Sequence, residues 1–235
     1  MQNVQPVEKI VHGDEGYTLD VHSVFLTIQG EGPYVGRRAV FVRLAGCNLQ
    51  CPQCDTDYTT GRSRVATEDL ARRCAELHAG QDTKPLVVIT GGEPLRQPIG
   101  RLLDKILSQG FDVQLETNGT AYQALPYLHP SLTVVCAPKT GRLNGRLLPH
   151  IDALKYVITA GDVDPRNGLP YTALGHTASP RLALPPPNFR GTVYVQPCDE
   201  QDSEKNAANL AATIDSVMRF GYTLCLQTHK YIGME

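Results

Sequence analysis

The apolar residues of this chain fall into short runs that alternate with longer amphipathic segments. Runs of strand length lie at 21–28, 37–44, 85–90, 111–115, 132–136, 153–158, 192–195 and 222–226. Helical spacing of apolar residues appears in a segment that Thr67 can cap, over 99–108, and in a segment that Asp202 or Ser203 can cap. The last segment presents the apolar stripe Leu210, Ile214 and Met218. The pattern predicts strands that alternate with helices or long loops.

Most of the predicted strands end in polar or glycine-rich residues. Alternation of strands and helices is typical of parallel pairing, in which the carboxyl ends of the strands meet at one edge and carry the chemistry. About six such units are too few for a closed eight-stranded barrel. We therefore expect an α/β fold, a partial, open parallel β/α barrel of about six strands, in a single domain over 1–235. A polar N-terminal extension (1–20) and long surface loops at 140–150 and 160–190 complete the expected organisation.

Composition and charge exclude several classes of function. A length of 235 residues suffices for one domain with a sizeable core, and a net charge of −2 gives no reason to expect a nucleic-acid partner. No run approaches the roughly 18 apolar residues of a membrane span, and residues 1–16 are polar and unlike a signal peptide. Cysteines outside the cluster described next are expected to be small buried apolar residues, namely Cys74, Cys136, Cys198 and Cys225. Free thiols of this kind predict a reducing, cytoplasmic location.

Three cysteines follow the second apolar run within eight residues. Cys47, Cys51 and Cys54 have the spacing C-x3-C-x2-C. Thiolates are the ligands that soft metals and iron–sulfur clusters select, and a set of three leaves one position open for a small molecule. The alternative is a zinc knuckle in which a nearby His or Asp supplies the fourth ligand.

Arg43 is the one charge in residues 39–44, the apolar stretch that leads into these cysteines. A buried charge is costly unless it is paired. The side chain therefore meets a carboxylate, faces a binding site, or extends from the strand edge to water.

Five motifs recur in an order and at separations that resemble one family. They are Phe-Leu-Thr-Ile-Gln-Gly-Glu-Gly at 25–32, Gly-Gly-Glu-Pro at 91–94, Glu-Thr-Asn-Gly-Thr at 116–120, Ala-Pro-Lys at 137–139 and Gln-Thr-His-Lys at 227–230. With the cysteine spacing, they resemble the 7-carboxy-7-deazaguanine synthase family of the radical S-adenosylmethionine (SAM) superfamily. The resemblance extends from Val21 to Glu235. It implies the partial barrel of that superfamily and conversion of 6-carboxy-5,6,7,8-tetrahydropterin to 7-carboxy-7-deazaguanine with loss of ammonia, in queuosine biosynthesis.

The resemblance also implies cofactors and partners. A four-iron four-sulfur cluster, SAM and Mg²⁺ are the expected cofactors, and the pterin is the expected small-molecule substrate. A flavodoxin- or ferredoxin-type protein is the expected electron donor, and the protein is expected to be a homodimer. Two other readings stay open from the residues: an activase of glycyl-radical enzymes, which shares the cysteine spacing, and a non-catalytic zinc-binding protein.

Site residues are carried over by position. The cluster ligands would be Cys47, Cys51 and Cys54, and the Mg²⁺ ligand would be Thr56, whose hydroxyl oxygen suits a hard cation. SAM would meet Gln53, Cys54, Asp55, Gly92, Glu93, Glu116, Asn118, Ala137, Pro138, Lys139, Gln196, Pro197, Cys198 and Asp199. The pterin would meet Ile28, Gln29, Gly30, Glu31, Arg43, Thr90, His229 and Glu235, and four of these would act on it directly: Gln29, Glu31, Arg43 and His229. Arg43 would bind the substrate carboxylate through its planar fork.

Three positions depart from the pattern of the family. Ala137 stands where many relatives have Ser, which removes a hydroxyl, and Cys198 stands where Met is expected. In some relatives the terminal carboxylate reaches the substrate, and here Glu235 brings a second charge to that position.

Overall fold

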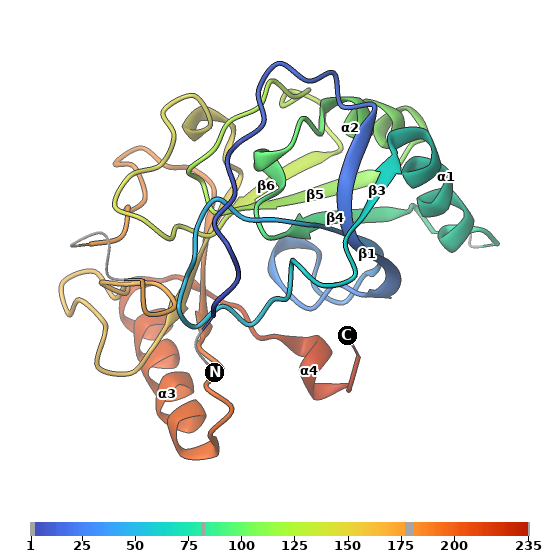
Figure 1. The fold of residues 1–235 in the computed structure, drawn as a ribbon. Helices are drawn as coiled ribbons and strands as arrows, with labels where there is room; N and C mark the ends of the chain where they lie inside the picture. The colour runs from blue at the N-terminus through green and yellow to red at the C-terminus, as the bar shows by residue number, and fades with distance from the viewer. Residues whose placement is uncertain (1–2, 81–82, 177–180, 235) are drawn as a thin grey trace.

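The computed structural model describes residues 3–80, 83–176 and 181–234, which form an α/β fold around one sheet (Figure 1). The strand order is β3-β1-β2-β4-β5-β6-β7-β8-β9. The strands are β1 (Thr18–Ile28), β2 (Arg38–Leu44), β3 (Ser63–Ala66), β4 (Leu86–Gly91), β5 (Asp112–Thr117), β6 (Leu132–Cys136), β7 (Ala153–Ile158), β8 (Thr192–Pro197) and β9 (Thr223–Leu224). The α-helices are α1 (Thr67–His78), α2 (Gly100–Ser108), α3 (Ser203–Phe220) and α4 (Thr228–Tyr231), and the 3-10 helices are η1 (Gly32–Tyr34), η2 (Pro94–Arg96) and η3 (Leu148–His150). Because β3 and β9 lie at opposite edges, the sheet is open, which confirms the predicted fold class.

The number and direction of the strands differ from the prediction. The described residues form nine strands rather than about six, and β9 spans two residues rather than the predicted 222–226. β2 and β4 to β9 are parallel, as expected, but β1 is antiparallel to both β2 and β3. The connection 29–37 explains the direction of β1, because a parallel pair requires a crossover of a dozen or more residues. The loop that follows β1 carries the second half of the first motif. It therefore starts beside Arg38, at the amino end of β2.

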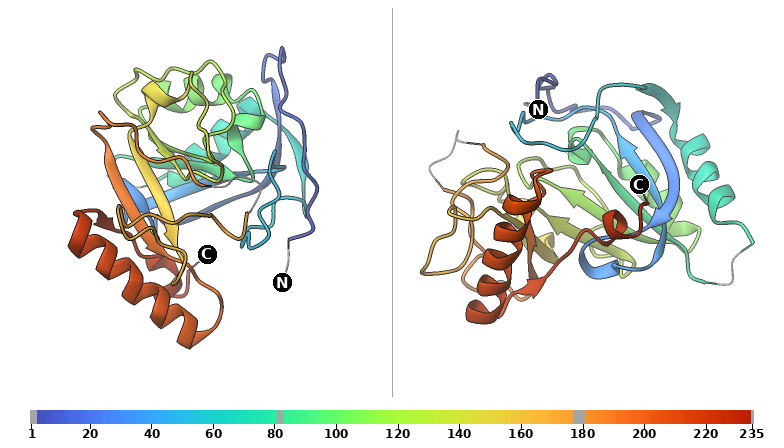
Figure 2. Two further views of the ribbon diagram at one scale, coloured as in Figure 1. Left: turned by 90° about the vertical axis from the view of Figure 1, so that its left-hand side faces the viewer. Right: turned by 90° about the horizontal axis from the view of Figure 1, so that it is seen from below.

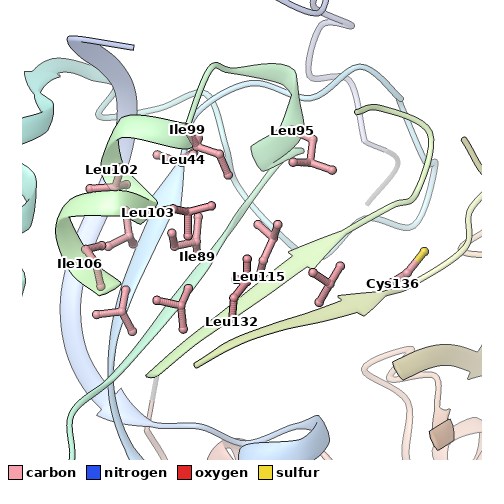
Figure 3. Close-up of a cluster of buried hydrophobic side chains, with 14 of the residues drawn as sticks. Leu44, Ile89, Leu95, Ile99, Leu102, Leu103, Ile106, Leu115, Leu132 and Cys136 are labelled. Carbon is pink, nitrogen blue, oxygen red and sulfur yellow. The ribbon is translucent and has the colours of Figure 1, made fainter. Parts of the chain in front are cut away.

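Side chains of the parallel strands divide between the two faces of the sheet. Successive residues of a strand point to opposite faces, and paired residues of neighbouring strands share a face. Apolar residues on one face pack against α1 and α2 and form the core shown in Figure 3; among them are Leu44, Ile89, Leu115 and Leu132 from the strands and Leu102 and Ile106 from α2. The other face carries polar side chains at the intervening positions: Arg43, Thr90, Glu116 and Lys155. Side-chain alternation thus places polar groups from four strands on the face away from α1 and α2.

α3 lies against β8 and β9, at the opposite end of the sheet from α1 (Figure 2). Asp202 caps it by accepting hydrogen bonds from Glu204 N at 3.0 Å and Lys205 N at 3.1 Å, which confirms the predicted start. Two of its three apolar stripe residues are exposed. Ile214 is 45% exposed and Met218 is 79% exposed, while Leu210 is half-buried.

The residues that α3 buries are Asn209, Thr213 and Ser216, whose side chains all find hydrogen-bond partners. Polar side chains whose hydrogen bonds are all made can be buried. The spacing of apolar residues along the sequence does not reveal such positions. At the start of α1, the predicted cap is wrong, since Ala66 is the N-cap residue and the Thr67 hydroxyl donates to Gly16 O instead.

The two long loops contribute to the core. η3 is the regular element described within 140–150, and the described parts of 160–190 contain no named helix or strand. Leu147, Leu169, Ala173 and Leu182 are nevertheless buried in the main core cluster. These segments therefore pack against the sheet rather than lying entirely on the surface. In the part of the chain that the structure describes, no helix has the length and apolar character needed to cross a membrane.

Candidate active site

The cysteine loop leaves the carboxyl end of β2 and carries three free thiols. Cys47 and Cys51 are buried and Cys54 is half-buried. Burial raises the pKa of all three thiols, to about 12 for Cys47, where nearby Glu93 and the other two thiols raise it further. Three neighbouring thiols in a poorly solvated place favour a bound cationic centre, because such a centre stabilises the thiolates.

These thiols suit a cluster. Within the described ranges, no three His, Cys, Asp or Glu side chains surround one point closely enough to hold a single metal ion. An iron–sulfur cluster needs another arrangement, with each thiolate on a separate iron. Three thiolates on one loop would supply three of the four ligands of a four-iron cluster and leave one iron free of protein ligands.

The Gly-Gly-Glu-Pro turn after β4 packs directly on the cysteine loop. Gly92 N donates to Leu44 O at 3.2 Å, and Glu93 N donates to Gly46 O at 3.0 Å. A Cβ atom on Gly92 would lie 2.2 Å from Gly46 O and 2.9 Å from Cys47 Cβ. Only glycine permits this approach, so the turn is held at a fixed distance from the first cysteine.

The Glu93 carboxylate joins this turn to the end of β5. Its Oε1 accepts from Leu95 N at 2.9 Å and from the Thr117 hydroxyl at 2.7 Å, and its Oε2 accepts from Asn118 N at 2.7 Å. Burial raises the pKa of Glu93 despite these bonds. Asn118 Nδ2 in turn donates to Asn48 Oδ1 at 3.0 Å, which connects the same group to the cysteine loop.

Segment 3–11 of the polar N-terminal region lies along the cysteine loop (Figure 2). Asn3 N donates to Pro52 O at 2.8 Å, Asn3 Nδ2 donates to Cys51 O at 3.1 Å, and Glu8 N donates to Cys47 O at 2.7 Å. The loop is therefore restrained by residues that precede the first strand.

Arg96 of η2 fixes segment 3–11 to the sheet. Its side chain is 4% exposed, and its guanidinium lies 3.2 Å from Glu8 Oε2 and 3.7 Å from Asp20 Oδ2. It also donates to Ala45 O at 3.1 Å. One buried cation thus links the N-terminal segment, β1 and the start of the cysteine loop.

The residues predicted to bind SAM lie in several places around the cysteine loop. Gln53 and Asp55 are exposed on the loop. Lys139, after β6, lies close to Cys51 and Cys54. Its positive charge partly offsets the increase that burial causes in the pKa of both thiols. Residues 197–199, after β8, line a pocket together with residues of α3 and the 226–231 segment.

A buried polar group occupies the face of the sheet away from α1 and α2. The Lys155 ammonium on β7 contacts Glu31 Oε2 and lies 3.7 Å from Glu116 Oε2. Gln29 Nε2 donates to Glu116 Oε1 at 3.4 Å, and Gln29 Oε1 accepts from Glu31 N at 3.1 Å. Burial opposes ionisation of Glu31, but the ammonium and hydrogen bonds from Lys155 and Gln227 outweigh it, so the pKa of Glu31 is lowered. Glu116, which was predicted to bind SAM, therefore lies in the same group as Gln29 and Glu31, which were predicted to bind the pterin.

His229 packs against the backbone of Gly30, in the loop that carries Gln29 and Glu31. Thr228 N and the Thr228 hydroxyl both donate to Gly30 O at 3.2 Å. Burial lowers the pKa of His229, and the nearby Glu31 carboxylate acts in the opposite direction. The C-terminal motif therefore covers the loop that carries Gln29 and Glu31.

Arg43 and Thr90 pair directly in register between β2 and β4. The Arg43 guanidinium is half-buried, 5.7 Å from the centre of the Phe25 ring. Among the described residues it forms no ion pair with a carboxylate. Its positive charge acts to lower the pKa of the Cys54 thiol, against the effect of burial.

Sequence reasoning assigned no role to three members of this polar group: Gln114, Lys155 and Gln227. Gln114 Nε2 donates to Glu116 Oε1 at 2.8 Å, and Gln227 Nε2 donates to Glu31 Oε1 at 2.9 Å. Lys155 could have been singled out from the sequence by the reasoning applied to Arg43, because it is the one charge in the apolar run 153–158. Glu235 lies outside the described residues.

Comparison with known proteins first defines the class. Residues 42–131 match the model of the radical SAM superfamily. The fold is similar to that in the crystal structure of QueE from Escherichia coli, with a TM-score of 0.67 and 20% identity over 90% of this chain and 95% of that chain. Residues 42–131 thus carry a match to the radical SAM superfamily, a class that uses a four-iron four-sulfur cluster and SAM.

Full-length relatives then define the family. The chain is 43% identical to a 7-carboxy-7-deazaguanine synthase of Rhodospirillum rubrum over 93% of both chains. It is 38% identical to one of Rickettsia prowazekii over 98% of this chain and 94% of that one. The chain therefore belongs to the 7-carboxy-7-deazaguanine synthase family, as the motifs predicted, rather than to the activases or zinc-binding proteins.

Proposed function

We propose that this protein is a 7-carboxy-7-deazaguanine synthase, a lyase that converts 6-carboxy-5,6,7,8-tetrahydropterin to 7-carboxy-7-deazaguanine and ammonia. The observation that carries the proposal is the 43% identity over 93% of both chains with a relative of that name. The substrate and the two products balance in atoms and oxidation level, so the overall reaction needs no net oxidant.

The polar face of the sheet complements a carboxypterin in charge. Arg43 offers a planar fork for the substrate carboxylate, and such forks bind carboxylates through two parallel hydrogen bonds. Glu31 and Glu116 offer carboxylate oxygens for the N–H groups of the ring, and Gln29 offers an amide that can donate or accept. A ligand with an anion at one end and N–H donors at the other matches this arrangement.

When bound, the cluster and SAM supply the one-electron chemistry that begins the reaction. Cys47, Cys51 and Cys54 would hold the cluster, while Gly92 and Glu93 lie against the loop at the place predicted for SAM. The protein's own residues orient the pterin and keep water away from it. The packing of His229 on Gly30 serves the second role, because it covers the loop that holds the ring.

We also propose Mg²⁺ as a further cofactor, held by Thr56. The Thr56 hydroxyl lies 3.3 Å from Asp55 Oδ1, and oxygen donors of this kind suit a hard cation that keeps other positions for substrate and water.

The proposed protein partners are a flavodoxin- or ferredoxin-type electron donor and a second copy of the chain. Exposed apolar side chains on α3, Ile214 and Met218, support association. Light scattering of the cluster-loaded protein tests the dimer, and reduction of the cluster by each purified donor tests the electron source.

Anaerobic turnover tests the main proposal. The cluster-loaded protein is incubated with SAM, Mg²⁺, a chemical reductant and the carboxypterin, and the products are identified by mass. The expected product is 7-carboxy-7-deazaguanine, with ammonia in equal amount. A preparation that cleaves SAM but leaves the carboxypterin unchanged would overturn the assignment.

A further inference from the structure

Lys155 is a buried cation shared by two carboxylates from distant parts of the chain. Its side chain is 9% exposed, and its ammonium contacts Glu31, in the loop after β1, and Glu116, on β5. The side chains of Glu31 and Glu116 are 13% and 22% exposed. β6 separates β5 from β7 in the sheet, so Lys155 reaches across one strand to Glu116.

Each carboxylate is also held from a second direction. Glu31 Oε1 accepts from Gln227 Nε2 at 2.9 Å, and Glu116 Oε1 accepts from Gln114 Nε2 at 2.8 Å. The amides orient these oxygens but bring no charge. Lys155 is therefore the cation that balances the pair, and one negative charge remains for N–H groups of a ligand to meet.

We propose that Lys155 is a positioning residue for the pterin, which acts by holding the Glu31 and Glu116 carboxylates on either side of its ammonium and aimed at the N–H groups of the ring. The inference rests on the proposed function. Lys155 itself donates to Glu31 rather than to the substrate, so its effect passes through the two carboxylates. Without the shared cation the two partly buried carboxylates repel each other, and a proton taken up by Glu31 removes an acceptor for the ring.

The surroundings of Lys155 define the expected pH dependence. The charged and titratable groups that face it are Glu31, Glu116, Lys139, Cys225 and His229. In the wild-type protein Lys155 helps to lower the pKa of Glu31, so this carboxylate is ionised throughout neutral pH and pterin affinity should change little there. Loss of the cation leaves burial dominant and raises that pKa. Affinity should then be weak at low pH and should recover as pH rises.

The test is calorimetric titration of the carboxypterin into SAM-bound, cluster-loaded protein between about pH 6 and pH 8.5. For Lys155→Gln, the Kd should rise by about tenfold for each pH unit below the new pKa, because one proton must leave before binding. Lys155→Arg keeps the charge and should retain an affinity that varies little with pH. Lys205→Gln removes an exposed lysine of α3, whose side chain is 60% exposed, and should match the wild type.

The outcomes separate the two proposals. A wild-type protein that does not bind the carboxypterin refutes the proposed function, whatever Lys155 does. If the wild type binds and Lys155→Gln has the same Kd and pH profile, the positioning role is refuted. Equal, pH-independent weakening in Lys155→Gln and Lys155→Arg also refutes it, because steric damage would then explain both. Should Lys155→Gln fail to fold, the double variant with Glu116→Gln restores the net charge. It should show a smaller rise of the Kd at low pH, because Glu31 lacks its cation but no longer faces a second carboxylate.

Discussion

Replacement of Gly30 by alanine should separate pterin binding from SAM cleavage. A Cβ atom at this position would lie 2.0 Å from His229 Nδ1, 2.9 Å from His229 Cγ and 3.0 Å from His229 N. Ordinary contact begins at 3.4 Å, so the ring must move by roughly 3.4 − 2.0 = 1.4 Å, and the bonds from Thr228 to Gly30 O must lengthen. Overpacking of this kind costs about 1–3 kcal/mol. Because the displaced loop must return to its original position to bind the carboxypterin, that cost corresponds to about a 5- to 150-fold increase in the Kd. SAM cleavage in the absence of pterin should persist, because Gly30 is not among the residues predicted to bind the cluster or SAM.

Gly145→Ala is the matched control for Gly30→Ala. Both glycines have backbone angles that alanine tolerates, but a Cβ atom on Gly145 meets no atom within 4 Å. Calorimetry with the carboxypterin and a SAM-cleavage assay should be run on both variants. The double variant Gly30→Ala, His229→Ala should bind no more weakly than His229→Ala alone, because the ring that clashes is absent. Wild-type pterin affinity in Gly30→Ala would contradict the packing of His229 on this loop.

Three further replacements test the other parts of the site. Cys51→Ala should abolish the iron–sulfur absorbance and SAM cleavage, and a variant that keeps its iron, sulfide and activity would remove Cys51 from the ligand set. Thr56→Ala should weaken the response of turnover to Mg²⁺ while the iron content stays unchanged; an unaltered Mg²⁺ titration would place the cation elsewhere. Arg43→Ala should raise the Kd of the carboxypterin by about 30-fold to several thousand-fold, since loss of a buried charge pair costs about 2–5 kcal/mol. Arg43→Lys should be nearly as weak because it lacks the planar fork, and calorimetry that finds wild-type affinity in either variant would move the carboxylate contact to another cation.

The parallel part of the fold could be predicted because its strands are short apolar runs, each closed by polar residues. The direction of β1 could not be read from its own residues. It depends on the connection 29–37, which is too short for a crossover and forces an antiparallel pair. The buried face of α3 could not be read from its apolar residues either, since it carries the hydrogen-bonded Asn209, Thr213 and Ser216 while Ile214 and Met218 are exposed.

The cysteine loop was predictable because its chemistry is local, with three thiols within eight residues. The polar group around Lys155 was not, because it draws on the loop after β1, β5, β7 and the C-terminal motif. No spacing along the chain relates Glu31 to Gln227, which meet only in the folded protein. A lone lysine in an apolar strand was the available indication, and its partners required the register of the sheet.

The contacts of segment 3–11 bear on where the functional unit of this protein begins. The match to the superfamily model starts at residue 42, and the first strand starts at Thr18. A truncation at Thr18 would spare every strand but would take Glu8 from the buried Arg96 guanidinium and free the carbonyl groups of Cys47 and Cys51. A truncation at residue 42 would in addition remove β1 and more than half of β2. The chain shortened at Thr18 could build its sheet while its cluster ligands lost the support on one side. The minimal unit for holding iron is therefore longer than the minimal unit recognised by motif.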